Sequence, residues 1–572
     1  MTGVEKTWKR PVCAAIVGTC SVFLLYFSIK ALVPYLEIFI GNPSDMTIWG
    51  ISIAVGVIFA LFVLFRKKRR YKGIENGSAD WISPKKLCAA VSNSDAKQNI
   101  LLSENVKIDL QAKKVKNDHV LILGGSGTGK SFRYMIPNIM MMNASYIITD
   151  PKGELLARTG KMLEKQGGYK IKVFNIKDFS QSMHFNPFEY FNSTTDVLRF
   201  IDVLMANTSD PTKHGGDPFW DECTKLLLQA FCCYLQETLD KSEQTIPNII
   251  YLLENEEVRE DDEEFQNAVD LLFEDLAEEK PASFAVAQYR KFKLAAGKTM
   301  KSILISVAAR LYAFSVPEIQ QMLSFDEMDI EDMREHKTAL FLIIDDSDTT
   351  YNFLVAVLID TIFRVLVRKA DKDLVERGTD GIPVRCLLDE IANIGKFPKL
   401  EILIATLRSR HISLEMCWQN VDQGKAIYDK YWPTIEGNCE TTLFLGGKGE
   451  ETEKYVSKVM LGQSTIETVS YTGSSTAGGI GIGSYGSNQQ NAGRALLDET
   501  EVARIADDEC LISIRGHQPC KDTKIETWKL PNYKYLSDKN PKNTYHFRPN
   551  SFMKDLEDPD KIFYVTDMDG YA

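Results

Sequence analysis

A glycine-rich segment that follows an apolar run constrains the fold of this chain more than any other feature. Residues 124–131 read GGSGTGKS and match the pattern GxxxxGK[ST] in full. The apolar run HVLIL precedes them, and the helix-compatible SFRYMI begins at their last residue. Between a strand and a helix, such a loop folds its backbone N–H groups around phosphates. The segment therefore predicts a P-loop that binds a nucleotide.

Each position of this loop has an expected role. Its members are Gly124, Gly125, Ser126, Gly127, Thr128, Gly129, Lys130 and Ser131. The glycines let the backbone close around the phosphates, the Lys130 ammonium reaches the β- and γ-phosphates, and the Ser131 hydroxyl holds Mg²⁺. We therefore expect ATP and Mg²⁺ as ligands.

Short apolar runs alternate with helical patterns along much of the chain. The runs are residues 119–123, 145–149, 171–176, 339–344, 384–388, 413–418, 441–445 and 510–514. Most of them lack strict polar–apolar alternation, which is typical of strands buried on both faces of a parallel sheet. The pattern predicts a doubly wound α/β domain.

The alternation is interrupted between about residue 195 and residue 335, where the pattern is helical. Residues 220–235 carry an apolar stripe with a period of 3.6 residues, and residues 301–314 are a second helix candidate. Residues 254–280 hold thirteen acidic side chains against two basic ones. This acidic stretch is either a solvated helix face or a docking surface for a basic partner.

Two carboxylates follow the apolar run 384–388. A P-loop needs an acidic partner at the end of a buried strand, so Asp389 is expected to bind Mg²⁺ and Glu390 to act as general base. Apolar runs also end in Asp150 and Asp345, but only Asp389 is followed directly by a glutamate. The segment DPKGE that starts at Asp150 is either a plain turn or, as we favour, part of the nucleotide site.

Two further residues downstream are candidates. Arg408 and Arg410 end a helical segment, and Gln419 follows the next apolar run. A glutamine at a neighbouring strand end can sense the γ-phosphate, and an arginine at a subunit edge can reach a neighbouring nucleotide in trans. Exposed arginines are often merely solvated. The seven dispersed histidines form no HxH or HExxH motif and no Cys/His cluster, so no zinc site is expected.

The first 72 residues differ from the rest in hydropathy and charge. Residues 12–33 and 47–65 are each long enough to cross a bilayer core of about 30 Å, which predicts a two-helix transmembrane hairpin. A signal peptide is the alternative, but a convincing cleavage site is lacking. This part carries ten Lys and Arg against three Asp and Glu, concentrated at its two ends, so both ends are expected in the cytoplasm.

The remaining chain is acidic, and it holds nine of the eleven cysteines. It holds 57 basic and 75 acidic residues, so any contact with nucleic acid must be local. Eleven cysteines without a CxxC pair are typical of a reducing compartment. Residues 471–493 are rich in Gly and Ser, which predicts a flexible loop, and the tail after residue 530 ends acidic.

Several motifs in order resemble the type IV secretion coupling proteins, the TraG/TraD family of conjugative ATPases. They are GGSGTGKS, TDPKGEL, FNPF at residues 185–188, DPFWDECTKLLLQA, LLDEIANIGKFPKLEILIATLRSR, WQN and ECLISIRG. The resemblance implies a RecA-like P-loop motor domain with an inserted all-α domain and an N-terminal two-helix transmembrane hairpin. The implied divisions are 1–72 hairpin, 73–100 linker, 101–194 and 336–530 nucleotide-binding domain, 195–335 all-α domain and 531–572 tail.

The same resemblance implies a function. It is that of a hexameric ATPase in the bacterial inner membrane, which recruits single-stranded DNA with its covalently attached relaxase, together with relaxosome proteins. ATP hydrolysis with Mg²⁺ would drive this cargo through a type IV secretion channel. In this family Asp389 and Glu390 would serve hydrolysis, Gln419 would be the sensor, and Arg408, eleven residues earlier, the arginine finger. The alternatives are an FtsK-like translocase and a receptor for protein-only effectors. The acidic surface of this chain departs from the family pattern and argues against tight DNA binding by the chain outside the hairpin.

Overall fold

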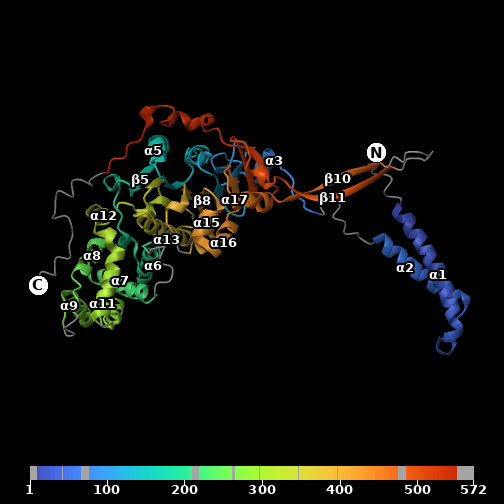
Figure 1. Cartoon of the computed structure of the whole chain (residues 1–572), viewed down its shortest axis with the longest axis horizontal. Coiled ribbons are helices and arrows are strands. Elements are labelled where there is room, and N and C mark those ends of the chain that lie inside the picture. Colours follow the sequence, from blue (N-terminus) through green and yellow to red (C-terminus); the bar gives the residue numbers. More distant parts are fainter. Residues whose placement is uncertain are drawn as a thin grey trace. The chain divides into compact units, whose positions relative to one another are not determined.

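The computed structural model divides the chain into two compact units, Met1–Glu75 and Asn76–Ala572 (Figure 1). It describes residues 9–40, 43–65, 76–111, 113–208, 218–259, 265–295, 297–345, 347–379, 381–395, 397, 399–473 and 485–549. The predicted acidic end of the tail, residues 551–572, lies outside the described residues.

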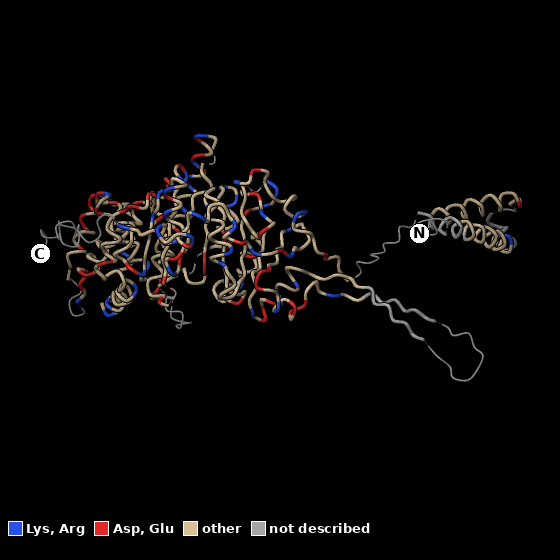
Figure 2. The backbone as a smooth tube through the Cα atoms, turned by 90° about the horizontal axis from the view of Figure 1, so that it is seen from above, with Lys and Arg blue, Asp and Glu red and all other residues tan. Residues whose placement is uncertain are grey.

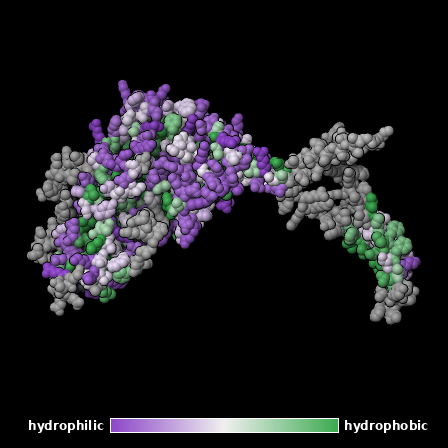
Figure 3. All heavy atoms as spheres, in the orientation of Figure 1, coloured by the Kyte–Doolittle hydropathy of each residue, from purple (hydrophilic) through white to green (hydrophobic). Residues whose placement is uncertain are grey.

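The first unit is a pair of helices, α1 (Lys9–Ile40) and α2 (Asp45–Phe65). They pack through stacking of Tyr26 on Trp49, with ring centroids 4.1 Å apart, and Lys30 of α1 pairs with Asp45 of α2 at 3.1 Å. Apolar side chains such as Phe27 are exposed on this unit (Figure 3). Among the described residues, no helix is both long and apolar enough to cross a membrane. The helical hairpin is observed, but its expected role as two membrane spans is not supported.

The second unit is built on a nine-stranded sheet in the order β13-β12-β9-β3-β8-β7-β4-β6-β5. The strands are β3 (Val120–Leu123), β4 (Ser145–Thr149), β5 (Lys170–Asn175), β6 (Thr338–Ile343), β7 (Val384–Leu388), β8 (Ile412–Trp418), β9 (Thr441–Phe444), β12 (Glu509–Ile514) and β13 (Cys520–Thr523). The seven from β9 to β5 are parallel, and β12 runs antiparallel to both β9 and β13. All eight predicted strands are present, and β13 was not anticipated.

Each face of the sheet is buried under its own hydrophobic core. On β7, Cys386 belongs to one core and Leu387 to the other, as the alternation of side chains along a strand requires. The first core includes α13 (Asn352–Arg377), α14 (Leu400–Leu407), α15 (Val421–Tyr428) and α16 (Trp432–Gly437), and the second includes α3 (Pro84–Val91), α4 (Ile136–Ile139) and α5 (Glu154–Gly167). The parallel sheet is therefore covered on both sides, as predicted for a P-loop-type α/β motor.

The elements that the structure describes between β5 and β6 are all helical. They are α6 (Thr194–Thr208), α7 (Pro218–Thr238), α8 (Ile246–Glu254), α9 (Ala268–Glu279), α10 (Phe284–Phe292), α11 (Gly297–Leu311) and α12 (Pro317–Met322), with shorter turns between them. The two helices expected at 220–235 and 301–314 correspond to α7 and α11. These helices share the first core with the sheet, and their status as a separate inserted domain stays a prediction.

The acidic stretch 254–280 is only partly solvated. Glu256 and Asp270 are buried, and both lie within hydrogen-bond distance of the Tyr289 hydroxyl oxygen, at 2.9 and 2.8 Å. Acidic and basic residues are interspersed over this second unit rather than gathered in one basic band (Figure 2). Of the two interpretations, a solvated helix face therefore does not hold for these two carboxylates.

A long hairpin replaces most of the flexible loop predicted at 471–493. Strands β10 (Gln463–Gly473) and β11 (Tyr485–Ala495) pair antiparallel along their whole length, because paired strands satisfy each other's backbone groups even where the sequence is rich in Gly and Ser. Residues 474–484 lie outside the described part. The remaining elements are β1 (Asn99–Leu101), β2 (Lys107–Asp109), α17 (Glu450–Tyr455) and α18 (Glu499–Val502).

Candidate nucleotide-binding site

The loop after β3 is held in an open curve by its glycines. Gly127 and Gly129 have φ angles of +78° and +92°, in the left-handed region that favours glycine. At Gly124 a side chain would bring its Cβ within 2.6 Å of Thr128 Oγ1. The loop leads into a π-helical turn, η1 (Lys130–Met135), which continues as α4; together η1 and α4 form the P-loop helix.

A second glycine turn, after β9, closes against this loop. The N–H of Gly125 donates to the carbonyl of Gly446 at 3.0 Å. A Cβ on Gly447, whose φ is +137°, would lie 2.8 Å from the backbone nitrogen of Gly125. Sequence reasoning missed this contact, although two consecutive glycines after a buried strand were the available signal.

Lys130 and Ser131 point toward neighbouring oxygen atoms at the mouth of the loop. The Lys130 ammonium, on a residue only 7% exposed, donates to the carbonyl of Gly124 at 2.7 Å and to that of Gly125 at 3.3 Å. The Ser131 hydroxyl donates to Asp389 Oδ2 at 2.6 Å. The structure thus brings the P-loop serine and the predicted carboxylate together.

Asp389 is a buried carboxylate with one oxygen unused. Its Oδ1 has no hydrogen-bond partner among the residues that the structure describes. Burial raises the pKa of this carboxyl, against the hydrogen bond from Ser131 and the charge of Lys130. A hydroxyl and a carboxylate with a spare oxygen are the donors that Mg²⁺ prefers beside phosphate, so the residues present fit the expected metal.

Glu390, directly after Asp389, has a strained backbone with φ of +52°. Its two carboxylate oxygens each accept a side-chain amide at 3.3 Å, one from Gln419 and one from Asn393. Glu390 and Gln419, predicted as base and sensor from segments 29 residues apart, therefore lie in contact.

Asp150 directly follows β4 and lines the same cavity as Lys130, Ser131 and Asp389. Its Oδ2 accepts the N–H of Leu156 at 2.8 Å, which ties the turn to the start of α5. Burial raises the pKa of the Asp150 carboxyl to about 6. The neighbouring Thr149 hydroxyl donates to the carbonyl of Asp389 at 2.8 Å, so β4 and β7 are joined at their carboxyl ends.

These groups surround a cavity of about 330 Å³ at the carboxyl edge of the sheet. It is lined by Gly125, Ser126, Gly127, Gly129, Lys130, Ser131, Phe132, Asp150, Pro151, Lys152, Glu154, Leu155, Arg158, Asp389 and Glu390. Lys152 and Arg158 add positive charge that the sequence analysis did not single out. A phosphate-bearing ligand suits such a cavity, because it combines backbone donors, a lysine and a candidate metal site.

The family model for the type IV secretory system conjugative DNA transfer proteins matches residues 77–550. The chain belongs to this family. Its curated relatives include the conjugal transfer protein TraG of Escherichia coli, 23% identical over 403 residues, which covers 68% of this chain and 62% of that protein. TraG of Agrobacterium fabrum is 20% identical over 540 residues, 86% of this chain and 78% of the relative. The resemblance seen in the motifs is thereby confirmed.

Solved structures of the conjugative coupling protein TrwB have the same fold. The unbound monoclinic form superposes with a TM-score of 0.57 at 16% identity, over 78% of this chain and 92% of TrwB. The TrwB complex with ADP and Mg²⁺ superposes with a TM-score of 0.56 over the same shares of the two chains. This likeness supports the α/β motor architecture.

The family's predicted arginine finger, Arg408, lies far from the cavity of its own chain. It is exposed in the short turn η7 (Arg408–Arg410), just before the amino end of β8. Its charge acts on buried Asp118, which precedes β3 and whose pKa burial raises to about 7. Because the P-loop follows the carboxyl end of β3, a strand's length separates the two. The second candidate, Arg410, is ion-paired with Asp371 at 2.9 Å.

Proposed function

We propose that this chain is the coupling ATPase of a conjugative type IV secretion system, which hydrolyses ATP to drive DNA transfer. The proposal rests above all on Ser131 and Asp389, which meet at 2.6 Å opposite the Lys130 ammonium with one oxygen of Asp389 unpaired among the described residues. The solved TrwB complexes with ADP and Mg²⁺ and with a non-hydrolysable ATP analogue support this choice of ligand. Because the alignment spans 62% of the first curated relatives, activity and partners remain our proposal.

Nucleotide binding would engage the loop and its lysine first. The backbone N–H groups of the loop other than those of Gly124, Gly125 and Thr128, which are bonded within the fold, would surround the phosphates. The Lys130 ammonium would exchange the carbonyl oxygens of Gly124 and Gly125 for phosphate oxygens. Ser131 and Asp389 would hold Mg²⁺, which neutralises negative charge on the phosphates when bound.

Hydrolysis then depends on Glu390. The oxygen of a water attacks the γ-phosphorus, the bond from that phosphorus to the bridging oxygen breaks with release of ADP, and the Glu390 carboxylate accepts the proton of the water. The amides of Gln419 and Asn393, each 3.3 Å from a Glu390 oxygen, orient this carboxylate. Gln419 can also contact the γ-phosphate, and because it directly follows β8, loss of that contact would be transmitted to this strand.

Arg408 would act across a subunit boundary. Its place at the amino ends of the strands lies too far from its own P-loop for a direct contact, so an arginine-finger role requires a neighbouring chain. We therefore propose a ring, most simply the homohexamer expected for the family, in which Arg408 of one subunit approaches the nucleotide of the next.

The proposed cargo is single-stranded DNA with its attached relaxase and relaxosome proteins, passed on to the secretion channel. We further propose that α1 and α2 attach the chain to the inner membrane, because apolar side chains such as Phe27 and Ile58 are 66% and 65% exposed. Extraction of cell membranes with alkaline carbonate tests this attachment: release of the full-length chain into the supernatant would refute it.

The central test measures Mg²⁺-dependent ATP hydrolysis by the full-length protein, with and without single-stranded DNA, alongside conjugative transfer in cells. Stimulation of ATPase activity by single-stranded DNA supports the proposal. Hydrolysis that responds to a secreted protein and not to DNA would favour the protein-only receptor, which the acidic charge of the chain also suits. Stimulation only by double-stranded DNA would favour an FtsK-like translocase.

A further inference from the structure

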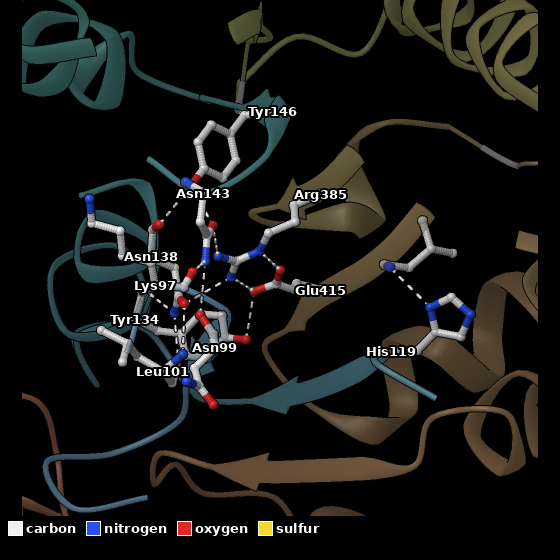
Figure 4. Close-up of polar contacts among 11 residues, drawn as sticks. Lys97, Asn99, Leu101, His119, Tyr134, Asn138, Asn143, Tyr146, Arg385 and Glu415 are labelled. Carbon is white, nitrogen blue, oxygen red and sulfur yellow. Dashed lines mark hydrogen bonds and ion pairs between the residues drawn. The ribbon is translucent and has the colours of Figure 1, made fainter. Parts of the chain in front are cut away.

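A fully buried ion pair lies beneath the P-loop helix (Figure 4). Arg385 of β7 and Glu415 of β8 are both completely buried, with Nε to Oε1 at 2.7 Å and Nη2 to Oε2 at 2.8 Å. Their strands are adjacent and parallel. Two charges withdrawn from water in this way need excellent geometry and further hydrogen bonds to offset their desolvation.

The P-loop helix supplies some of those further hydrogen bonds. Tyr134 donates its hydroxyl to Glu415 Oε2 at 2.8 Å, and Asn138 accepts from Arg385 Nη2 at 2.8 Å. Both helix residues are fully buried. Burial raises the pKa of Tyr134 well above its ordinary value, so its hydroxyl stays a donor. The helix is thereby bonded to both members of the pair.

Tyr134, Arg385 and Glu415 form a buried cluster, and each of them lies close along the chain to a residue of the nucleotide site. Tyr134 is one helical turn beyond Lys130 and Ser131. Arg385 of β7 precedes Asp389, the first residue after that strand, by four positions, and Glu415 of β8 precedes Gln419, the first residue after β8, by four. Residues four apart on a strand share a face and lie about 13 Å apart. One cluster therefore connects the three elements that carry the loop, the carboxylates and the sensor.

We propose that Arg385, Glu415 and Tyr134 are positioning residues for nucleotide hydrolysis. The cluster fixes the P-loop helix against β7 and β8, and so holds the Ser131 hydroxyl at Asp389, the two residues that would hold Mg²⁺. The inference rests on the proposed ATPase function. An apolar trio would also fill this volume, but it would not set the position of the helix along the strands, because only the hydrogen bonds are directional.

A merely stabilising role is separable from this one by a matched pair of tyrosine variants. Tyr134→Phe keeps the ring and the ion pair and removes only the hydroxyl that links helix to strand. Tyr190→Phe is the control, because Tyr190 is also buried and donates to a carboxylate, Asp326, at 2.6 Å, away from the P-loop helix. Both variants lose a hydrogen bond to an acidic group, and Tyr190→Phe also loses the long hydrogen bond from the Ile330 N–H at 3.4 Å.

The measurements are ADP binding as a function of Mg²⁺ concentration, kcat and KM for ATP, and the melting temperature of the full-length chain. We expect Tyr134→Phe to need several-fold more Mg²⁺ for half-maximal ADP binding and to lower kcat about tenfold, since small misplacements of reacting groups have large effects. Tyr190→Phe should lower the melting temperature similarly and leave both nucleotide readouts unchanged. Equal behaviour of the two variants would overturn the proposal.

A second variant removes the charges together. Arg385→Met combined with Glu415→Leu leaves no unpaired buried charge, so the protein should stay folded yet show the same increased need for Mg²⁺. A folded double variant with wild-type Mg²⁺ dependence and kcat would reduce the pair to a structural role. If the wild-type chain binds no nucleotide, that result would refute the proposed function and therefore this inference as well.

Discussion

The Ser131 hydroxyl and the Asp389 carboxylate are joined by a 2.6 Å hydrogen bond although 258 residues separate them in the chain. Ser131 lies on the P-loop helix, which follows β3, and Asp389 directly follows β7. In the sheet order β7 is the second strand from β3, with β8 between them. Strand pairing therefore sets the distance between the two candidate magnesium ligands. Substitutions at this edge of the sheet should affect chemistry before they affect folding.

Lys130→Ala should abolish ATP hydrolysis and DNA transfer while leaving the chain folded. The lysine neutralises phosphate charge, whereas its ammonium donates to two loop carbonyls among the residues that the structure describes. Hydrolysis of radiolabelled ATP and thermal melting check this. Lys161→Ala, outside the cavity lining, where the ammonium donates to the carbonyl of Lys542 at 2.6 Å, is the control and should keep its activity. Wild-type transfer by Lys130→Ala would refute the motor hypothesis.

Glu390→Gln should bind ATP yet hydrolyse it very slowly. An amide is a poor acceptor for the proton of the attacking water, and loss of a general base costs about 10²–10⁴-fold in rate. Equilibrium binding of ATP and single-turnover hydrolysis separate the two effects. Loss of binding equal to the loss of rate would show that Glu390 is structural.

Arg408→Ala should leave nucleotide affinity near normal and remove most turnover, because a finger acts mainly as charge develops and is worth about 10³–10⁵ in kcat in other systems. Mixing Arg408→Ala with Lys130→Ala subunits should restore some hydrolysis, since mixed rings contain interfaces with both groups intact. Arg410→Ala, which loses the ion pair with Asp371, tests the second candidate in the same assay. Failure to complement where mixed rings form would move the finger elsewhere.

Gly447→Ala should weaken nucleotide binding by shifting the P-loop. The new Cβ would lie 2.8 Å from the backbone nitrogen of Gly125, a contact that real structures do not show. Gly516→Ala provides the control, because its φ of +86° is also left-handed but no atom lies within 4 Å of the added Cβ. Titration with a fluorescent ADP analogue should give a higher Kd for the first variant alone.

The eight predicted strands were recognisable because strands buried on both faces need continuous apolar runs. The P-loop and Asp389–Glu390 were recognisable because their chemistry demands particular residue types at fixed spacing. Strand β13 was not, since its sequence, CKDT, alternates burial with exposure over only four residues. The hairpin β10–β11 was missed because its Gly- and Ser-rich sequence is typical of a loop. The Arg385–Glu415 pair was missed because its two residues lie 30 positions apart, which local patterns do not reveal.

The buried Glu256 predicts a pH dependence of stability. Burial raises its pKa to about 7, against the nearby Lys293, from an ordinary 4.5. Between these values the folded state holds the proton more tightly than the unfolded state, so the free energy of unfolding should fall as pH rises, by up to about 3 kcal/mol. Relative to wild type, Glu256→Gln should gain stability between pH 5 and pH 8. Denaturant titrations measure this, with the exposed Glu257→Gln as a control expected to show no such trend.

The chain enters its larger unit at the root of the β10–β11 hairpin. The N–H of Asn76 donates to Thr465 Oγ1 at 2.9 Å, and that of Ala79 donates to the carbonyl of Gln463 at 3.0 Å. A pull on the backbone at Asn76 is therefore divided between two routes, onward toward α3 and sideways into β10. The second route leads back along the chain to β9 and the Gly446–Gly447 turn that touches the P-loop. A load applied at Asn76 would therefore be shared between α3 and a hairpin strand whose chain leads back to the turn that contacts the P-loop.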